Sequence, residues 1–354
     1  MLNITFKKHI LDFNFEAGTS RGILTNHTVY YLKIENPTNK NHYGLGEAAP
    51  LKGLSIDYLP NFEVILNNIC TQFSKIENLG FADIYKWIPN TLPSIKFAFE
   101  TALLDYKYGG IRKIFSNDFS EKNTPITING LIWMGDKTLM LNRIKEKIEA
   151  GYTTLKLKIG AIDFKEEITL LESIRKDYSE EKLSLRLDAN GAFTPAEAHQ
   201  KLDILKQFQI HSIEQPLAAG QKNAMKNLIE KNIIPIALDE ELIGVFGTEK
   251  YKLLAWLKPQ FIILKPTLLG GFEATKEWIQ YAENHDIKWW VTSALESNIG
   301  LNAIAQFVGE FENKLPQGLG TGQLYKNNIE SPLEIKSGQL FYNQNLPWNL
   351  AFTH

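Results

Sequence analysis

Apolar residues and lysines alternate along residues 154–160, which read Thr-Leu-Lys-Leu-Lys-Ile-Gly. In a strand, this alternation places the apolar side chains on one face and Lys156 and Lys158 on the other, about 7 Å apart. Taken alone, the stretch is typical of an antiparallel strand whose lysine face meets water. The interpretation changes further along the chain, where short apolar runs recur and each ends in a charged residue.

Downstream of residue 124, apolar runs alternate with segments of helical periodicity, such as 139–150, 165–177 and 195–207. This alternation indicates a β/α barrel rather than an open sheet. No GxGxxG or GxxxxGK(S/T) motif follows any run, which argues against a nucleotide-binding fold. The predicted strands are 126–130, 154–159, 184–188, 210–214, 234–238, 261–265 and 289–292.

The first hundred residues follow a different pattern. Residues 28–34 are rich in β-branched and aromatic side chains and predict a strand, whereas residues 62–73 repeat apolar positions at helical spacing. A second helix is expected to start with Ser94 as its N-cap and to run to about Tyr108. It is apolar on most sides, so we expect it to be buried between two units.

Residues 111–123 are mostly polar and predict a linker. The succession of strands, helices and then repeated strand–helix units suggests an α+β domain followed by the barrel. We predict the α+β domain over residues 1–118, the barrel over residues 119–318, and a segment over residues 319–354 that packs back on the first domain.

Composition limits the function classes. The 354 residues carry 38 basic and 40 acidic side chains, a net charge of −2, which gives no electrostatic argument for nucleic acid or an anionic membrane. The single cysteine, Cys70, excludes an intrachain disulfide and metal sites of the CxxC type. No signal-like segment and no apolar run of about 18 residues is present, so a cytoplasmic protein is expected.

Charged or polar residues stand at six successive strand ends, 25 to 30 residues apart. In a β/α barrel the carboxyl ends of the strands meet at one mouth, so three carboxylates converge there and repel one another. A divalent cation removes this repulsion, and all-oxygen ligands suit Mg²⁺ or Mn²⁺. The six residues are Lys158, Asp188, Glu214, Asp239, Lys265 and Ser293.

Lysines on both sides of a metal site suit the removal of a proton next to a substrate carboxylate. The cation stabilises the enediolate that forms, and a lysine accepts the proton. A single strand-end aspartate is more often a helix cap or a loop residue, but six such residues in register favour a catalytic site.

At these positions the chain resembles the enolase superfamily, in its muconate-lactonizing-enzyme-like branch. The resemblance covers nearly the whole chain and implies a modified (β/α)7β TIM-like barrel with an N-terminal α+β capping domain that the C-terminal tail completes. The matching motifs are Lys156-x-Lys158, Asp188-x-Asn190, Glu214-Gln215-Pro216, Asp239-Glu240 and Lys265-Pro266.

Within this branch, residues 129–135 and 292–301 resemble the o-succinylbenzoate synthase family. The resemblance implies a lyase of menaquinone biosynthesis that dehydrates 2-succinyl-6-hydroxy-2,4-cyclohexadiene-1-carboxylate through an enediolate. Its substrate is a small carboxylate, and no oligomeric state is predicted.

The resemblance also implies roles for the lysines. Lys158 would be the base that takes the α-proton, and Lys156 would make Lys158 easier to deprotonate and would orient it. Lys265, on the opposite face, would stabilise the enediolate by its charge.

The metal ligands implied by the resemblance are Asp188, Glu214 and Asp239, with Mg²⁺ as the cation and Mn²⁺ as the alternative. Asn190 and Glu240 would hold these ligands and Lys265 from the surrounding shell.

For the substrate, the resemblance suggests contacts with Ser293 and with the backbone at Gly318. Residues 18–22 match a mobile cap loop that closes the site, and Arg21 is our candidate for a carboxylate contact. Arg186 shares the inward strand face with Asp188, and no role is assigned to it.

Two alternatives stay open. Racemisation of N-succinylamino acids or epimerisation of dipeptides would use Lys158 and Lys265 as opposed bases. A barrel that kept its fold for binding only is the third class, because a fold alone does not determine function.

Overall fold

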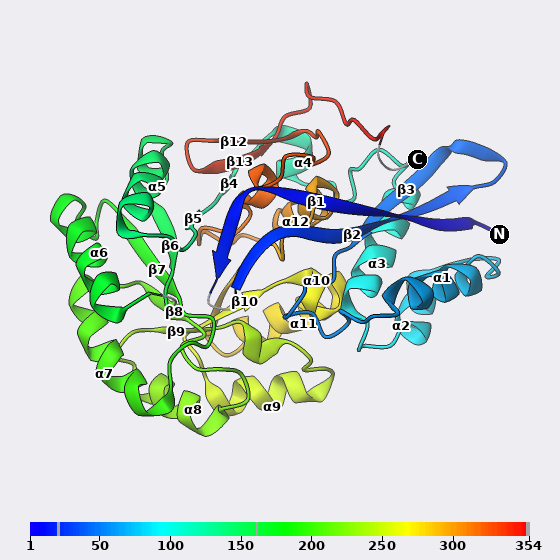
Figure 1. Cartoon of the computed structure of the whole chain (residues 1–354). Helices are drawn as coiled ribbons and strands as arrows, with labels where there is room; N and C mark the ends of the chain where they lie inside the picture. The colour runs from blue at the N-terminus through cyan, green and yellow to red at the C-terminus, as the bar shows by residue number, and fades with distance from the viewer. Residues whose placement is uncertain (20–21, 161, 352–354) are drawn as a thin grey trace.

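The computed structural model describes residues 1–19, 22–160 and 162–351, and Figure 1 shows two units in it. The N-terminal sheet is antiparallel, in the order β1-β2-β3. An apolar cluster joins this sheet to the three helices that follow it. These elements are β1 (Asn3–Thr19), β2 (Gly22–Asn36), β3 (Asn39–Ala48), α1 (Phe62–Phe73), α2 (Phe81–Trp87) and α3 (Pro93–Lys107).

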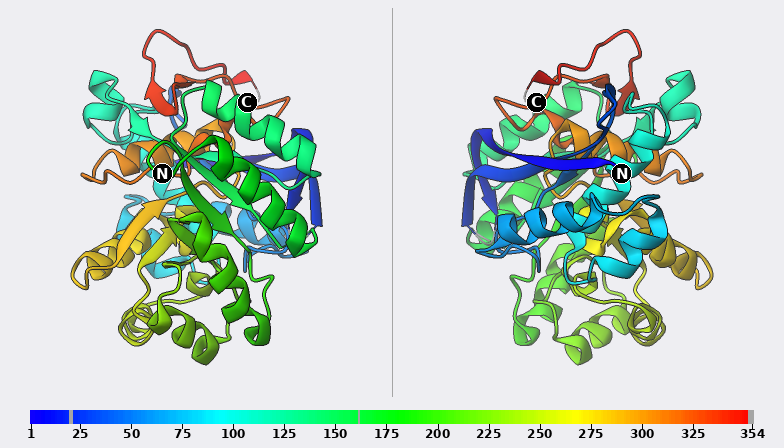
Figure 2. Two further views of the ribbon diagram at one scale, coloured as in Figure 1. Left: turned by 90° about the vertical axis from the view of Figure 1, so that its left-hand side faces the viewer. Right: turned by 90° about the vertical axis from the view of Figure 1, so that its right-hand side faces the viewer.

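The second unit is a seven-stranded parallel sheet in which each strand pairs with the next one in sequence, from β5 to β11. Figure 2 shows the helices of this unit around its strands, with the N-terminal sheet to one side. The strands are β5 (Gly130–Ile132), β6 (Thr154–Lys158), β7 (Ser184–Asp188), β8 (Ser212–Glu214), β9 (Ile236–Leu238), β10 (Phe261–Leu264) and β11 (Lys288–Val291). The helices are α5 (Lys137–Glu149), α6 (Phe164–Asp177), α7 (Pro195–Leu205), α8 (Lys222–Lys231), α9 (Thr248–Leu257), α10 (Pro266–Leu269), α11 (Gly271–Glu283) and α12 (Asn298–Val308).

Residues 317 and 318 close this sheet into a barrel. Gln317 bridges Ile128 at one edge and Gly318 bridges Thr292 at the other, both in parallel. Gly318 N also donates to Val291 O at 2.8 Å. The segment therefore stands where an eighth strand is expected, and the predicted barrel is confirmed.

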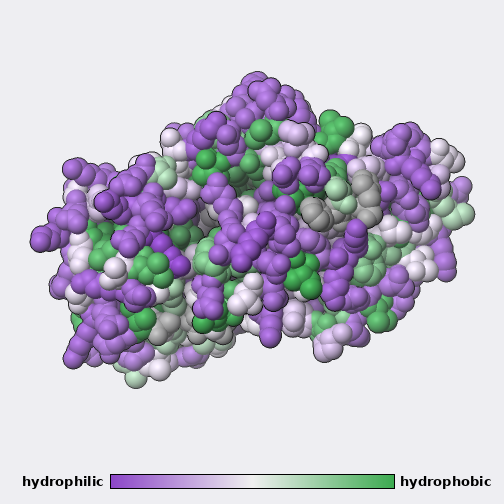
Figure 3. Space-filling view, turned by 45° about the horizontal axis from the view of Figure 1, so that its top comes forward, coloured by the Kyte–Doolittle hydropathy of each residue, from purple (hydrophilic) through white to green (hydrophobic). Residues whose placement is uncertain are grey.

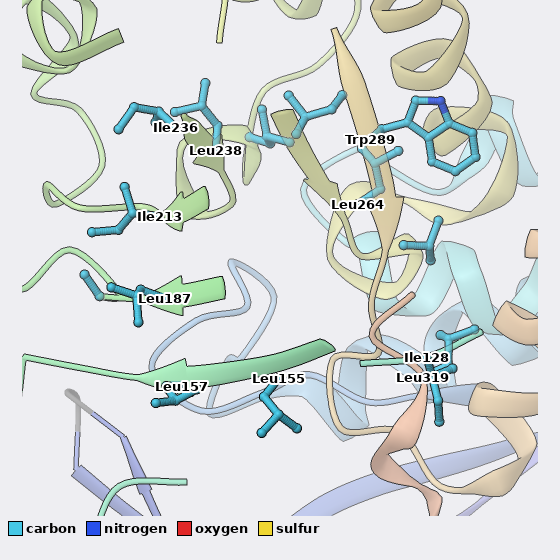
Figure 4. Packing of buried hydrophobic residues seen from close by; sticks show 14 of the residues in the cluster. Ile128, Leu155, Leu157, Leu187, Ile213, Ile236, Leu238, Leu264, Trp289 and Leu319 are labelled. Carbon is cyan, nitrogen blue, oxygen red and sulfur yellow. The ribbon is translucent and has the colours of Figure 1, made fainter. Parts of the chain in front are cut away.

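Figure 4 shows apolar side chains on successive barrel strands. Leu155 and Leu157 of β6, Leu187 of β7 and Ile213 of β8 belong to one large apolar cluster with residues of these helices. Successive side chains of a strand point to opposite faces, so both lysines of residues 154–160 point into the barrel. The pairing of this stretch is parallel, because β5 and β7 flank β6 in parallel, as the barrel pattern downstream predicts.

Helix α3 is buried along most of its length and ends beside Tyr108, as predicted. Its start differs from the prediction, because Pro93 is its first residue and Leu92 precedes it. Ser94 lies inside the first turn, where its amide and hydroxyl donate to Asp57 Oδ2 at 2.8 and 2.6 Å. The predicted Ser94 cap is therefore wrong, since a carboxylate from a distant loop satisfies this helix end.

The predicted polar linker at residues 111–123 is only partly polar. Arg112 and Ile114 are buried, and Arg112 Nε lies 2.7 Å from Asp105 Oδ2 of α3. The segment also contains a short helix, α4 (Asp118–Lys122). It packs against both units instead of spanning solvent.

The first barrel strand also departs from the prediction. Residues 126–130 divide between β4 (Ile126–Thr127) and the start of β5. Strand β4 pairs with β13 (Gln339–Tyr342), which pairs in turn with β12 (Leu333–Lys336). The C-terminal segment thus pairs with the entry to the barrel, and its residue 326 donates a backbone hydrogen bond to Asp12 of β1. The domain boundaries at residues 118 and 318 stay a prediction.

The surface is ordinary for a protein of this composition. On the face in Figure 3, hydrophilic residues predominate and hydrophobic ones lie scattered among them. None of the helices in the described residues is both long and apolar enough to cross a bilayer.

Candidate active site

Lysine ammonium groups lie among the predicted carboxylates at the carboxyl ends of the barrel strands. Lys156 Nζ is 3.0 Å from Glu214 Oε2 and 3.1 Å from Asp188 Oδ2, so it bridges β7 and β8. Lys265 pairs with Asp239. All three carboxylates are buried, and the barrel thus brings together five of the predicted residues.

Lys158 is held by two oxygens. Its Nζ donates to Asp188 Oδ2 at 2.9 Å and to Asn190 Oδ1 at 2.8 Å. Asn190 Nδ2 donates onward to Glu240 Oε1 at 3.0 Å. Asn190 and Glu240 therefore lie where they orient Lys158. Asn190 N also donates to Asp188 Oδ1 at 3.1 Å. Against the effect of burial, the Glu240 carboxylate helps to raise the pKa of Lys265, so both residues also lie beside the groups that the sequence assigned to them.

The electrostatics of the cluster follow from burial and from the converging charges. Burial and the Asp188 carboxylate raise the pKa of Glu214 to about 8, although Lys156 opposes this shift. Burial by itself would lower the pKa of Lys156, but the neighbouring carboxylates, Asp188 first, raise it above its ordinary value. Burial likewise opposes ionisation of Asp188, but Lys156 and Lys158 hold its pKa well below its usual range. Positive charge is strongly favoured at this place.

The donor set fits a hard divalent cation in ligand type and charge. Three buried carboxylates stand on neighbouring strand ends, and burial together with the nearby Asp188 carboxylate raises the pKa of Glu214. Within the described residues, no three acidic, histidine or cysteine side chains already enclose a point where an ion would sit. Lysine ammonium groups lie against all three carboxylates instead.

A cavity of about 300 Å³ opens above the lysines. Its polar floor includes Lys156, Lys158, Asp188, Asn190 and Lys265. Apolar side chains from both units form the walls, and they are Ile23, Leu24, Leu51, Leu54, Leu131, Trp133, Ala294 and Leu295. Such a cavity suits a small ligand with one polar, reacting end.

Both predicted substrate contacts from the barrel line this cavity. Gly318 belongs to the closing segment, where an added Cβ would lie 2.1 Å from Thr292 Oγ1. Ser293 Oγ donates to Glu296 Oε2 at 2.5 Å, so its proton is already committed inside the protein. Arg21 lies outside the described residues.

Arg186 takes a structural place inside the barrel. Its guanidinium lies 3.9 Å from the ring centroid of Trp290 and donates to Pro316 O at 2.8 Å. Arg186 therefore fastens the closing segment to β7 and β11, below the lysine cluster.

No role was assigned from the sequence to Trp133 or to two buried glutamates, Glu47 and Glu296, although Trp133 and Glu296 lie in the stretches 129–135 and 292–301 that carry the family resemblance. Trp133 lines the cavity with its ring centroid 5.8 Å from Lys158 Nζ. Position 133 follows the first barrel strand, and this strand-end position is the signal that points to it. The sequence does not reveal the partners of Glu47, because they lie about 250 residues away.

Comparison with known proteins agrees with this geometry. Residues 139–345 match the family described as Enolase C-terminal domain-like. The chain is 40% identical to the o-succinylbenzoate synthase of Desulfotalea psychrophila, over 96% of this chain and 98% of that protein.

Solved structures give the same result. The crystal structure of MenC from Desulfotalea psychrophila superposes with a TM-score of 0.85 at 36% identity, covering 96% of this chain and 99% of that one. A dipeptide epimerase from Enterococcus faecalis, complexed with Mg and L-Leu-L-Tyr, shares the fold with a TM-score of 0.84 at 19% identity over 99% of both chains. The chain belongs to the enolase superfamily, in its muconate-lactonizing-enzyme-like branch, and to the o-succinylbenzoate synthase family of lyases within it.

Proposed function

We propose that the chain catalyses the Mg²⁺-dependent dehydration of 2-succinyl-6-hydroxy-2,4-cyclohexadiene-1-carboxylate to o-succinylbenzoate, a step of menaquinone biosynthesis. One observation carries the proposal: a chain 40% identical to an o-succinylbenzoate synthase places Lys158 and Lys265 on one cavity. We also infer a cytoplasmic enzyme whose partner is this small carboxylate, and neither nucleic acid nor a membrane.

Lys158 is the proposed base. Its Nζ lies on the cavity floor, where Asn190 and Asp188 accept its hydrogen bonds and fix its direction. Neutral Lys158 takes the α-proton beside the substrate carboxylate, and the ring carbon next to it loses hydroxide. Lys158 then returns the proton to the departing oxygen, so the products are water and the aromatic ring. Proton and hydroxide leave from the same face, which one lysine can serve.

Lys265 is the proposed electrostatic partner. Its Nζ stands at the end of β10 and pairs with Asp239, and it stabilises the negative charge of the enediolate without moving protons. Asp188, Glu214 and Asp239 would hold Mg²⁺ in this proposal, with Mn²⁺ as the alternative. When bound, the cation would supply positive charge that stabilises the enediolate. Ser293, Gly318 and Arg21 are the proposed contacts to the substrate.

The second candidate is 1,1-proton transfer, that is, racemisation of N-succinylamino acids or epimerisation of dipeptides. One observation favours it, since Lys158 at the end of β6 and Lys265 just after β10 line the same cavity. Each lysine would then remove or return a proton on its own side. Incorporation of deuterium at the α-carbon in D₂O tests this candidate directly.

The diene absorbance of the cyclohexadiene substrate provides the first test. With Mg²⁺ the wild-type protein is expected to remove this absorbance, and EDTA is expected to stop the reaction. Lys158→Ala should lower kcat by at least about 10²- to 10⁴-fold, the usual range for loss of a general base. Urea unfolding of Lys158→Ala controls for loss of the fold.

Two results would contradict the proposal. Wild-type protein that leaves the diene unchanged in the presence of Mg²⁺ would exclude the dehydratase activity. Activity that survives in Lys158→Ala would exclude Lys158 as the base while leaving the reaction itself in place.

A further inference from the structure

Glu47 of β3 is a fully buried carboxylate that reaches from the N-terminal sheet into the barrel unit. Its Oε1 accepts Ser297 N at 2.8 Å. Its Oε2 accepts Ser297 Oγ at 2.6 Å and Gly300 N at 2.8 Å. These donors belong to the start of α12, where backbone N–H groups lack partners within the helix and a negative charge is favoured.

The residues just before α12 form the cavity turn, which we define as residues 293–297. Three of its members, Ser293, Ala294 and Leu295, line the cavity. Glu296 holds the turn from below, because its Oε2 accepts Ser293 Oγ at 2.5 Å and Ala294 N at 2.8 Å. The turn is thus built from hydrogen bonds to two buried carboxylates, one from each unit.

Leu295 shows that this turn is held against its own preference. Its φ is +70°, a left-handed conformation that costs a bulky residue free energy and persists only where the surroundings impose it. Tyr325 donates to Leu295 O at 2.6 Å, and Leu295 N donates to Ser293 Oγ at 2.9 Å. The strained residue is itself part of the cavity wall.

Gly300 lets the two carboxylates approach the same helix start. A Cβ at this position would lie 2.7 Å from Glu296 Cβ and 3.1 Å from Glu47 Oε2. Strand β3 also leads directly into Leu51 and Leu54, which form the opposite, N-terminal wall of the cavity. One carboxylate therefore joins the two walls between which a substrate lies.

We propose that Glu47 is a positioning residue for the substrate cavity: by binding the start of α12 across the two units, it sets the cavity turn at a fixed distance from the N-terminal wall. The identity of the substrate in this inference rests on the proposed function, whereas the hold of Glu47 on the cavity turn does not. Lys158 and Lys265 stand on other strands and have no hydrogen bond to the turn, so Glu47 affects substrate binding rather than the chemical step.

Glu47→Gln tests this role. A glutamine has a single carbonyl oxygen for three donors, and its amide group would face an N–H group, so at least one bond to α12 is lost. Glu100→Gln is the matched control. Glu100, on α3, is also buried, and it accepts the backbone N–H of Phe272 at the start of the barrel helix α11. Unlike the cavity turn, Phe272 does not line the cavity, and neither does Glu100.

Two readouts are needed. In the diene assay with Mg²⁺, Glu47→Gln is expected to raise KM about tenfold with kcat within about threefold, whereas Glu100→Gln keeps the wild-type KM. In hydrogen–deuterium exchange, peptides covering residues 293–300 are expected to exchange faster in Glu47→Gln only. If Glu47→Gln does not fold, Ser297→Ala takes its place. This variant removes the bond from Ser297 Oγ to Glu47 Oε2 and also the cap that the same oxygen provides to Ile299 N.

An unchanged KM in Glu47→Gln, an unchanged exchange of residues 293–300, or an equal effect in Glu100→Gln would overturn the inference. Failure of the proposed function is distinguishable, because wild-type protein would then leave the diene unchanged. The exchange comparison needs no substrate and still decides whether Glu47 holds the turn.

Discussion

At the scale of single residues, Asn190 connects the proposed base to the rest of the site. The side-chain amide of Asn190 accepts a hydrogen bond from Lys158 Nζ through Oδ1 and donates one to Glu240 Oε1 through Nδ2. The orientation of this amide therefore fixes the direction of the lysine. Its φ is +45°, a conformation that asparagine and glycine tolerate best. The residue therefore combines a backbone requirement with a side-chain function.

Asn190→Gly separates these two features, because glycine accepts the same φ and removes only the amide. We expect kcat in the diene assay to fall about 10- to 100-fold, as is usual when a partner that orients a reacting group is lost, with the free energy of unfolding little changed. The matched control is Asn232→Gly, since Asn232 has the same φ of 45° at the end of α8, away from the cavity. A wild-type rate in Asn190→Gly would mean that the amide does not position Lys158.

At the scale of elements, β3 lies unusually close to α3. A Cβ at Gly44 would lie 2.0 Å from Ala102 O, and a Cβ at Gly46 would lie 2.0 Å from Ala98 O. Glycines at these positions let the strand and the helix backbones touch. Because Glu47 follows Gly46, this packing also sets where Glu47 enters the barrel unit.

Gly46→Ala should therefore destabilise the protein by about 3 kcal/mol or more, the upper end of the cost of overpacking, because the clash is with backbone atoms that cannot rotate away. Urea unfolding measures this change. Gly80→Ala is the control, because its Cβ would meet only Asp83 Oδ2, at 3.9 Å, and we expect a loss within about 1 kcal/mol. Equal stability of the two variants would show that β3 and α3 can separate at little cost.

At the scale of the whole molecule, buried carboxylates join the two units. Glu47 binds the start of α12 and Glu100 binds the start of α11, and both originate in the N-terminal unit. Burial raises the pKa of each to about 7. The packing of the two units is thus linked to pH through Glu47 and Glu100, neither of which belongs to the lysine cluster.

For Glu100, the direction in which pH changes the free energy of unfolding follows from its raised pKa. Its pKa rises from 4.5 to about 7 on folding, so the folded protein holds a proton that the unfolded chain has lost between these values. Glu100 therefore lowers the free energy of unfolding as pH rises from 4.5 to about 7, by of the order of 3 kcal/mol in total. Glu100→Gln lacks this ionisation, and the difference in urea stability between wild type and variant should shift in favour of the variant across this window. A difference independent of pH would contradict the prediction.

The sequence by itself determined that the chain forms a barrel and which residues meet at the mouth of that barrel. Parallel strands of a barrel end on the same side, so residues spaced one strand–helix unit apart, such as Lys158, Asp188 and Glu214, have to meet wherever that fold forms. This argument needs only the period of the apolar runs. Because the period gives the order of the strands but not where each strand ends, the predicted order was accurate and the predicted boundaries were less so, as residues 126–130 show.

Only the tertiary structure decided which partners the buried polar groups take. Asp57 replaces the expected cap at Ser94, residues 317 and 318 close the barrel, and Glu47 binds a helix 250 residues away. A buried polar group needs a hydrogen-bond partner, but it takes whichever one the docking of the two units brings within reach. Local periodicity carries no information on that docking, because the contacts join segments whose separation in sequence follows no repeat.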